Sequence, residues 1–395
     1  MTSNKPIRIG YAISLTGPLG SNGRTAKLAH QIWEDDIKQR GGLLGRPVEM
    51  VRYDDQTNPA LVPGIYSRLL NEDKVDLVMG GYGDNSIGPA MPEIIEQNRY
   101  FVGLMGLAVN STFNYPNYFA MIPTGPNPGP ALTEGFFELA ARQSPKPQTV
   151  SLLVADAPFS RSPTQGAKDN AAKYGFRLIS EAKYPLATTD FTAFIREVAR
   201  FNADILFLCS YLNDSVGLVR ALHLVGFEPK LVGGAMIGPQ NGAVKVQLGP
   251  LLNGLVNYEY WLPGPRMNFV GVQKLIAEYQ TRAEGNDVDP LGYYVAPQAY
   301  AQMQVIEQAI RETGSVDDEK LATYSRESLF KTVVGDVRFG PGGGWVQPRV
   351  LHAQFQNIAK YDVGEFRDTK TEIVVSPTEF ASGELIYPYA KAKRT

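Results

Sequence analysis

The segment Ile7–Leu15, IRIGYAISL, is a short apolar run rich in β-branched residues, and it is followed by Arg24–Arg40, RTAKLAHQIWEDDIKQR. The apolar side chains of the second segment recur at helical spacing until the pair Gly41-Gly42 ends the pattern. A strand followed by an amphipathic helix is the repeating unit of parallel sheets covered by helices. The first forty residues therefore predict an α/β fold.

The same alternation continues along most of the chain. Further strands are predicted at 48–53, 75–79, 100–104, 150–155, 178–184, 204–209, 230–233 and 253–258. Further helices are predicted at 59–70, 89–97, 165–174, 191–201, 215–224, 269–282 and 295–311. A Pro/Gly cluster at 123–130 interrupts the rhythm, which then starts again, and hairpin-like strands are expected around 334–339 and 352–361. We therefore expect two Rossmann-like lobes with parallel sheets.

Length and composition agree with two lobes and narrow the classes of partner. A chain of 395 residues exceeds one ordinary domain, and 38 Lys+Arg against 40 Asp+Glu give a net charge of −2. This balance gives no reason to expect a nucleic-acid partner. The longest apolar runs are far shorter than the roughly 20 residues that cross a bilayer, so no direct membrane insertion is expected. The lone Cys209 lies in an apolar run and is predicted to be a core residue.

In open α/β sheets, ligands bind beyond the carboxyl ends of the strands. In the first half this rule selects the loops at 15–24, 80–88 and 103–110. In the second half it selects the loops at 155–164, 210–214 and 233–239. Three loops from each lobe are therefore expected to form the walls of one binding cleft.

The loop Gly80–Ser86, GGYGDNS, carries the strongest binding signal. It follows a strand and opens a helix, which directs free backbone N–H groups towards a bound anion. Asn85 and Ser86 can bond a ligand, cap the helix, or do both. The stretch is a near miss to the dinucleotide fingerprint, because a serine replaces the third glycine and no acidic residue follows about 20 residues later. No cofactor is therefore expected.

Enzyme and metal motifs are missing from the sequence. Three histidines form no HExxH pair, one cysteine excludes a CxxC site, and no nucleophile elbow or Walker sequence occurs. The chain is therefore predicted not to be an enzyme and to hold no metal. An NAD(P)-dependent enzyme is the rival hypothesis, and turnover or a change in cofactor fluorescence on mixing would reveal it.

Aromatic residues gather on or near the predicted cleft loops. They are Tyr82, Phe159, Tyr211, Tyr258, Tyr260 and Trp261. Aromatic rings offer broad apolar faces with a polar tip and suit a planar or apolar ligand. Packing of the hinge and lobes is the alternative role, and it weighs more for Phe159 and Trp261 than for Tyr82 and Tyr211.

Several runs together resemble the leucine/isoleucine/valine-binding proteins that feed ABC importers. These runs are Ile9–Tyr11, Ser14–Leu19, Gly41–Pro47, Tyr53–Pro59, Val78–Gly81, Asp190–Thr192, Arg220–Gly226 and Val334–Phe339. The likeness covers nearly the whole chain. It implies a type I periplasmic-binding fold with a three-segment hinge, with lobe one at 1–124 plus 252–330 and lobe two at 125–251 plus 331–395.

The resemblance also implies which residues contact the ligand. In lobe one these positions are Asn22, Tyr82, Gly83, Asp84, Asn85, Ser86, Met105 and Gly106. In lobe two they are Phe159 or Ser160, Tyr211, Ala235 and Met236, to which the aromatic pattern adds Trp261. Closure of the lobes is expected to sequester the ligand.

Three departures from the family pattern bear on the ligand. Ala235 stands where the amino-acid binders hold the ammonium with an acidic residue, and a buried ammonium without a partner costs several kcal/mol. Met105–Ala108 replaces a loop whose hydroxyl groups clasp the carboxylate. Thr57 and Gly83 stand where the relatives carry a disulfide. Asp84 can take over as the ammonium's partner, or it can point away and cap.

We therefore expect an extracytoplasmic receptor of an ABC importer for a small aromatic or apolar carboxylate, with permease subunits as partners. The carboxylate would meet the N–H groups near Asn85 and Ser86, and the ring would lie among Tyr82, Tyr211 and Met236. Branched-chain or other amino acids are the alternative ligands. No apolar leader precedes the first strand, so a periplasmic location requires a signal absent from this chain, and a cytosolic ligand sensor of the same fold is the alternative.

Overall fold

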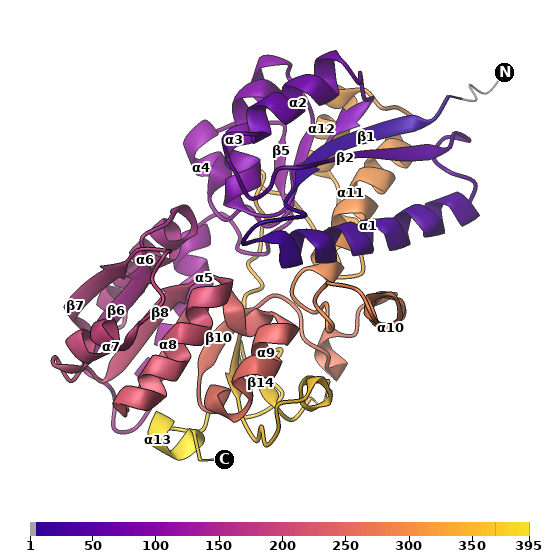
Figure 1. The fold of residues 1–395 in the computed structure, drawn as a ribbon. Helices are drawn as coiled ribbons and strands as arrows, with labels where there is room; N and C mark the ends of the chain where they lie inside the picture. The colour runs from indigo at the N-terminus through magenta and orange to yellow at the C-terminus, as the bar shows by residue number, and fades with distance from the viewer. Residues whose placement is uncertain (1–4, 368, 395) are drawn as a thin grey trace. The chain divides into compact units, whose positions relative to one another are not determined.

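A computed structural model describes residues 5–367 and 369–394, which fold into two compact units (Figure 1). Unit 1 comprises Met1–Pro126 and Asn268–Pro348, and unit 2 comprises Asn127–Met267 and Arg349–Thr395. Each unit is thus assembled from stretches that are far apart in the sequence. Within the described residues, no helix combines the length and the apolar character needed to cross a bilayer.

Two of the three crossings between the units lie later in the chain than expected. Unit 1 resumes at residue 268 where 252 was expected, and unit 2 resumes at residue 349 where 331 was expected. Strand β10, Val256–Glu259, pairs in parallel with β9, Leu231–Met236, and so belongs to the sheet of unit 2. Phe339, which follows the hairpin of β11 (Phe330–Thr332) and β12 (Gly335–Val337), packs its ring on Phe119 of unit 1, with 5.2 Å between the centroids. Pairing and packing partners therefore decide to which unit these segments belong.

Unit 1 contains the start of the chain and three helices from its later part. Its strands are β1 (Ile7–Ile13), β2 (Val48–Asp54), β3 (Leu77–Val78), β4 (Phe101–Gly103), β5 (Tyr118–Ala120), β11 (Phe330–Thr332) and β12 (Gly335–Val337). Its helices are α1 (Gly20–Gln39), α2 (Val62–Asn71), α3 (Asp84–Glu96), α4 (Val109–Phe113), α10 (Val272–Ala283), α11 (Ala296–Thr313) and α12 (Asp318–Glu327). Strands β2, β1 and β3 pair in parallel in that order, as do β4 and β5.

Backbone hydrogen bonds carry the sheet of unit 1 across from β3 to β4. The N–H of Gly80 donates to the carbonyl of Val102 at 2.9 Å, and the N–H of Gly83 donates to the carbonyl of Leu104 at 2.9 Å. The segment after β3 therefore runs beside the segment after β4. This pairing brings the two loops that carry most of the predicted contacts of lobe one next to each other.

Helix α11 packs against α1 (Figure 1) and also bonds the segments at the ends of β3 and β4. The amide of Gln302 donates to the carbonyls of Gly80 and Val102, at 2.8 and 2.7 Å. Its oxygen lies 3.2 Å from Nε2 of the buried His30 in α1. One side chain of α11 thus supports β3, β4 and α1 together.

Unit 2 is built on one seven-stranded sheet in the order β14-β13-β10-β9-β8-β6-β7. The strands not yet given are β6 (Thr149–Ala155), β7 (Arg177–Tyr184), β8 (Ile205–Ser210), β13 (Leu351–Phe355) and β14 (Glu372–Ser376). The helices are α5 (Pro128–Ala141), α6 (Pro158–Lys173), α7 (Thr192–Ala199), α8 (Leu212–Val225), α9 (Gly242–Leu248) and α13 (Tyr389–Ala392). The first five strands in the chain pair in parallel, and β13 and β14 are antiparallel. Cys209 is fully buried in β8, which confirms it as a core residue.

Four helices begin earlier than the sequence patterns predicted. Helix α1 begins at Gly20 and not at 24, α3 at Asp84 and not at 89, α6 at Pro158 and not at 165, and α8 at Leu212 and not at 215. Their first turns are rich in small and polar residues and lack the apolar periodicity used to locate helices. Most of the residues expected on loops there therefore lie in the first turns of helices.

Candidate functional site

The first turn of α3 forms the centre of the predicted contacts in unit 1. Gly83 precedes the helix with φ +82°, in the left-handed region that favours glycine, and a Cβ there would meet no atom within 4 Å. The N–H of Ser86 donates to the carbonyl of Gly83 at 3.2 Å. The N–H of Asn85, in the same turn, has no carbonyl one turn earlier to bond. This turn can therefore accept an anion or a hydrogen-bond acceptor.

Tyr82 is held from three sides inside unit 1. Its backbone forms a parallel bridge with Leu104, and its side chain is 3% exposed. Its hydroxyl accepts a hydrogen bond from the amide of Asn22 at 2.8 Å and donates to the hydroxyl of Tyr294 at 3.4 Å. Burial raises the pKa of Tyr82 well above its usual value. The structure thus brings Asn22 and Tyr82 together as predicted partners of one wall, and Tyr294 is a member that the sequence did not indicate.

The loop after β4 lies against the first turn of α3. Met105 has φ +63°, and the N–H of Leu107 donates to Oδ1 of Asp84 at 3.0 Å. A Cβ on Gly106 would lie 2.9 Å from Cδ1 of Ile87 and 3.1 Å from the hydroxyl of Tyr118, so a larger residue there would require these side chains to shift. The carboxylate of Asp84 thus bonds this neighbouring loop.

Two hydroxyl groups in this region are buried without a hydrogen-bond partner among the described residues. They belong to Ser86, which is 1% exposed, and Tyr118, which is 2% exposed. The Oη atom of Tyr118 lies 2.7 Å from the position of a Cβ on Gly103 and 3.1 Å from that of one on Gly106. Buried polar groups are normally satisfied, so each of these two hydroxyl groups can take up one further hydrogen-bond partner. Tyr118 was not predicted, because it lies in a strand whose pattern is that of the core.

In unit 2, Phe159 and Tyr211 form one structural pair. The N–H of Phe159 in α6 donates to the hydroxyl of Tyr211 at 3.0 Å. The two rings meet edge to face with 5.8 Å between their centroids. Ser160, the next residue of the same turn, is 2% exposed. The structure therefore groups these three predicted residues at the carboxyl ends of β6 and β8.

Ala235 and Met236 end strand β9 beside this pair. They pair with Cys209 and Ser210 of β8, and Tyr211 follows directly. Met236 exchanges two hydrogen bonds with the side chain of Asn257, at 2.9 and 2.8 Å. Ala235 is fully buried and brings no charged group to this strand end.

Trp261 follows β10 and is fully buried. Its indole N–H donates to the carbonyl of Met267 at 2.8 Å. The polar atom of this ring is thus used within unit 2, which favours the packing role that the sequence left open for it. The structure describes no group of three or more His, Cys, Asp or Glu side chains that could hold a metal ion among residues 5–367 and 369–394.

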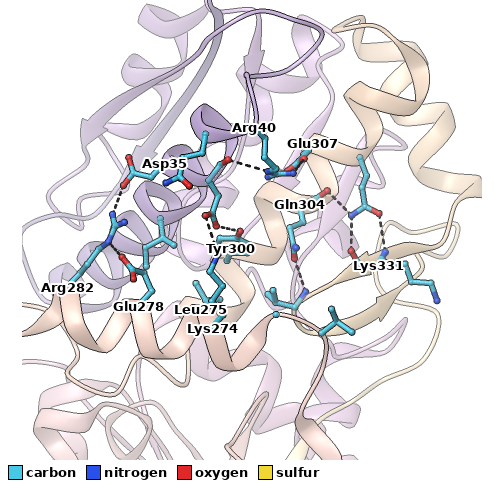
Figure 2. Close-up of a pocket in the computed structure, with 17 residues that line it drawn as sticks. Asp35, Arg40, Lys274, Leu275, Glu278, Arg282, Tyr300, Gln304, Glu307 and Lys331 are labelled. Carbon is cyan, nitrogen blue, oxygen red and sulfur yellow. Dashed lines mark hydrogen bonds and ion pairs between the residues drawn. The ribbon is translucent and has the colours of Figure 1, made fainter.

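A separate groove of about 950 Å³ lies on unit 1 between α1, α10 and α11 (Figure 2). None of the predicted site residues lines it. Arg282 pairs with Asp35 and Glu278 at 2.6 and 2.7 Å, and Arg40 pairs with Glu307 at 2.6 Å. Because these charges satisfy one another, we do not assign a ligand to this groove.

Comparisons with known proteins identify the relatives of the chain. The periplasmic binding protein family matches residues 6–356. The leucine-, isoleucine-, valine-, threonine-, and alanine-binding protein of Pseudomonas aeruginosa is 23% identical over 338 residues, which cover 85% of this chain and 86% of that protein.

Two solved structures of R. palustris solute-binding proteins share the fold. One, in complex with benzoate, has a TM-score of 0.77 and 12% identity, and covers 94% of this chain and 96% of its own. The other, in complex with 4-hydroxybenzoate, has a TM-score of 0.76 and 18% identity, with the same coverage. Both complexes place an aromatic acid on this architecture.

Proposed function

Because the chain belongs to the periplasmic binding protein family and is a solute-binding receptor of the kind that serves ABC importers, we propose that its ligand is a small aromatic carboxylate. The receptor acts outside the cytoplasm and delivers its ligand to ABC permease subunits. It performs no chemistry on that ligand.

The observation that carries this proposal is the identity of residue 235. The amino-acid binders that the sequence resembles use an acidic residue here, and Ala235 is fully buried at the end of β9. An ammonium placed beside residue 235 would lose its hydration and find no counter-charge on that residue, and a buried ammonium without a partner costs several kcal/mol. A ligand without an ammonium avoids that cost.

Each unit on its own offers groups that suit an aromatic acid. The first turn of α3, with the orphaned Ser86 hydroxyl, offers donors to a carboxylate. The edge-to-face pair of Phe159 and Tyr211 offers apolar ring surface to a planar body. The benzoate and 4-hydroxybenzoate complexes of the two R. palustris proteins support the same class of ligand.

Isothermal titration calorimetry with a panel of ligands tests the proposal. We expect benzoate, 4-hydroxybenzoate or phenylacetate to bind, and leucine and phenylalanine to give no heat at the same concentrations. Phe159→Ala should weaken binding, because the ring pair loses one partner. Phe201→Ala, which truncates a half-exposed ring in the same unit, is the matched control and should bind as the unmodified chain does. Binding confined to amino acids would refute the proposal.

A further inference from the structure

Asp84 places its own carboxylate where the loop after β4 presents backbone donors. Its Oδ1 accepts the N–H of Leu107 at 3.0 Å, and the amides of Leu107, Ala108 and Asp84 itself all favour the charged form of the carboxyl group. Backbone N–H groups gathered around one carboxylate form an anion-binding cradle. In this protein a side chain of the chain itself occupies that cradle.

Among the described residues, no Lys, Arg or His side chain pairs with the carboxyl group of Asp84. Burial raises the pKa of Asp84 to about 6, against the opposing effect of the three backbone amides. The titratable groups that face Asp84 are the phenols of Tyr82 and Tyr118. Burial raises the pKa of both phenols, and the negative charge of Asp84 adds to this effect. A carboxyl group in this setting changes its protonation easily near neutral pH.

The same turn also points to a bound guest. Ser86, two residues further along α3, has a buried hydroxyl group without a partner among the described residues, 3.1 Å from the position of a Cβ on Gly81. Asp84 belongs to the same first turn of α3, so a ligand carboxylate that bonds the N–H groups of this turn would lie close to the carboxyl group of Asp84. Two carboxylates that share one site do not both stay ionised, and one of them keeps a proton.

We propose that Asp84 is the residue that selects ligands by charge: an aromatic carboxylate binds together with one proton from solvent. Asp84 keeps this proton and donates a hydrogen bond through it to an oxygen of the ligand. This inference rests on the proposed function and adds the rule by which the site discriminates. A ligand that offers a hydrogen-bond donor to the ionised Asp84 would show the opposite dependence on pH.

The expected size of the effect follows from the fraction of protein that is ready to bind. At pH 6 about half of the Asp84 carboxyl groups carry a proton, and at pH 8 about 1% do. The ligand itself does not change charge in this range, since benzoic acids ionise near the range of ordinary carboxyl groups, at about pH 4. The affinity for benzoate should therefore fall about 50-fold from pH 6 to pH 8.

Calorimetric titration of the full chain with benzoate at pH 6, 7 and 8 measures this loss. At pH 7.5, titrations in phosphate and in Tris, which differ in ionisation enthalpy, should reveal the uptake of about one proton for each benzoate bound. Asp84→Asn should bind benzoate with nearly the same affinity at all three pH values. Glu96→Gln removes the same charge from an exposed position of the same helix and should keep the dependence on pH of the unmodified chain.

Each other result contradicts a defined part of the reasoning. Benzoate binding that is independent of pH in the unmodified chain overturns the role of Asp84 and leaves the proposed function standing. Affinity that rises with pH also overturns it and indicates a donor facing the ionised Asp84. Absence of benzoate binding in both the unmodified chain and Asp84→Asn refutes the proposed function and the inference together. If Asp84→Asn does not fold, the proton uptake of the unmodified chain decides alone.

Discussion

Replacement of His30 by glutamine should change how the stability of unit 1 depends on pH. His30 is fully buried in α1, with Nδ1 2.8 Å from the hydroxyl of Tyr11 and Nε2 3.2 Å from the oxygen of Gln302. Burial, helped by the charge of Arg52, lowers the pKa of His30 from its usual 6.5 to about 3. The imidazole is therefore neutral in the folded protein throughout the ordinary pH range.

The sign and size of the effect follow from linkage. The folded-state pKa lies below the unfolded one, so the stabilisation is complete above about pH 6.5 and is lost as the pH falls towards 3. At pH 5, 1.5 units below the unfolded value, the loss amounts to about 2 kcal/mol at roughly 1.36 kcal/mol per unit. His30→Gln carries no such titration. The free-energy difference between the two proteins should therefore shrink by about 2 kcal/mol from pH 7 to pH 5.

Urea denaturation at pH 7, 6 and 5 measures this difference, and hydrogen exchange of the β1 amides assigns the transition to unit 1. Tyr11→Phe serves as the control, because it removes a hydrogen bond to His30 and keeps the imidazole. It should destabilise unit 1 and retain the dependence on pH. A difference between His30→Gln and the unmodified chain that stays constant over this range would refute the reasoning.

Three further perturbations have defined outcomes. Lys245→Met should lower the unfolding free energy of unit 2, measured in urea, by about 3–5 kcal/mol, because it leaves the buried carboxylates of Glu259 and Glu372 without this ammonium. A loss below about 1 kcal/mol would contradict a stabilising role of these buried ion pairs. Ser86→Ala should change the unfolding free energy by less than about 0.5 kcal/mol and weaken benzoate binding about tenfold by calorimetry, since its hydroxyl has no partner inside the described chain, and unchanged affinity would exclude Ser86 as a ligand contact. Gly106→Ala should displace the loop after β4 and weaken benzoate binding with unchanged circular dichroism, and full affinity would show that the loop plays no part in binding.

Most strands could be predicted closely from the sequence, because a buried strand leaves a continuous apolar run, whereas the strands β5, β11 and β14 were not predicted. Strand β1 was expected from residue 7 and β6 near 150, and the structure begins them at Ile7 and Thr149. The helix starts could not be predicted in the same way. Helix α3 begins at Asp84 and contains Pro89 and Pro92, so its first turns carry none of the usual apolar spacing. Tertiary packing, and not local helix propensity, therefore determines where this helix begins.

For the site, the sequence indicated the positions and left the partners undetermined. Tyr82 was expected to face a ligand, and its hydroxyl is engaged by Asn22 and Tyr294, the latter 212 residues away in the chain. The bond from Leu107 to Asp84 likewise depends on two loops meeting across β3 and β4. Such contacts form only when the sheet is assembled, so no local sequence pattern predicts them.

The interleaving of the two units sets the order in which they can be completed during synthesis. The carbonyls of Gly80 and Val102 are bonded by the amide of Gln302, which is synthesised about 200 residues later. Unit 1 is therefore complete only when residues up to Pro348 have left the ribosome. A chain that stopped there would carry a whole unit 1 beside a five-stranded remnant of unit 2, with β10 as a bare edge. Translation thus leaves unit 2 open to proteases and to edge-to-edge association until β13 and β14 arrive near the very end of the chain.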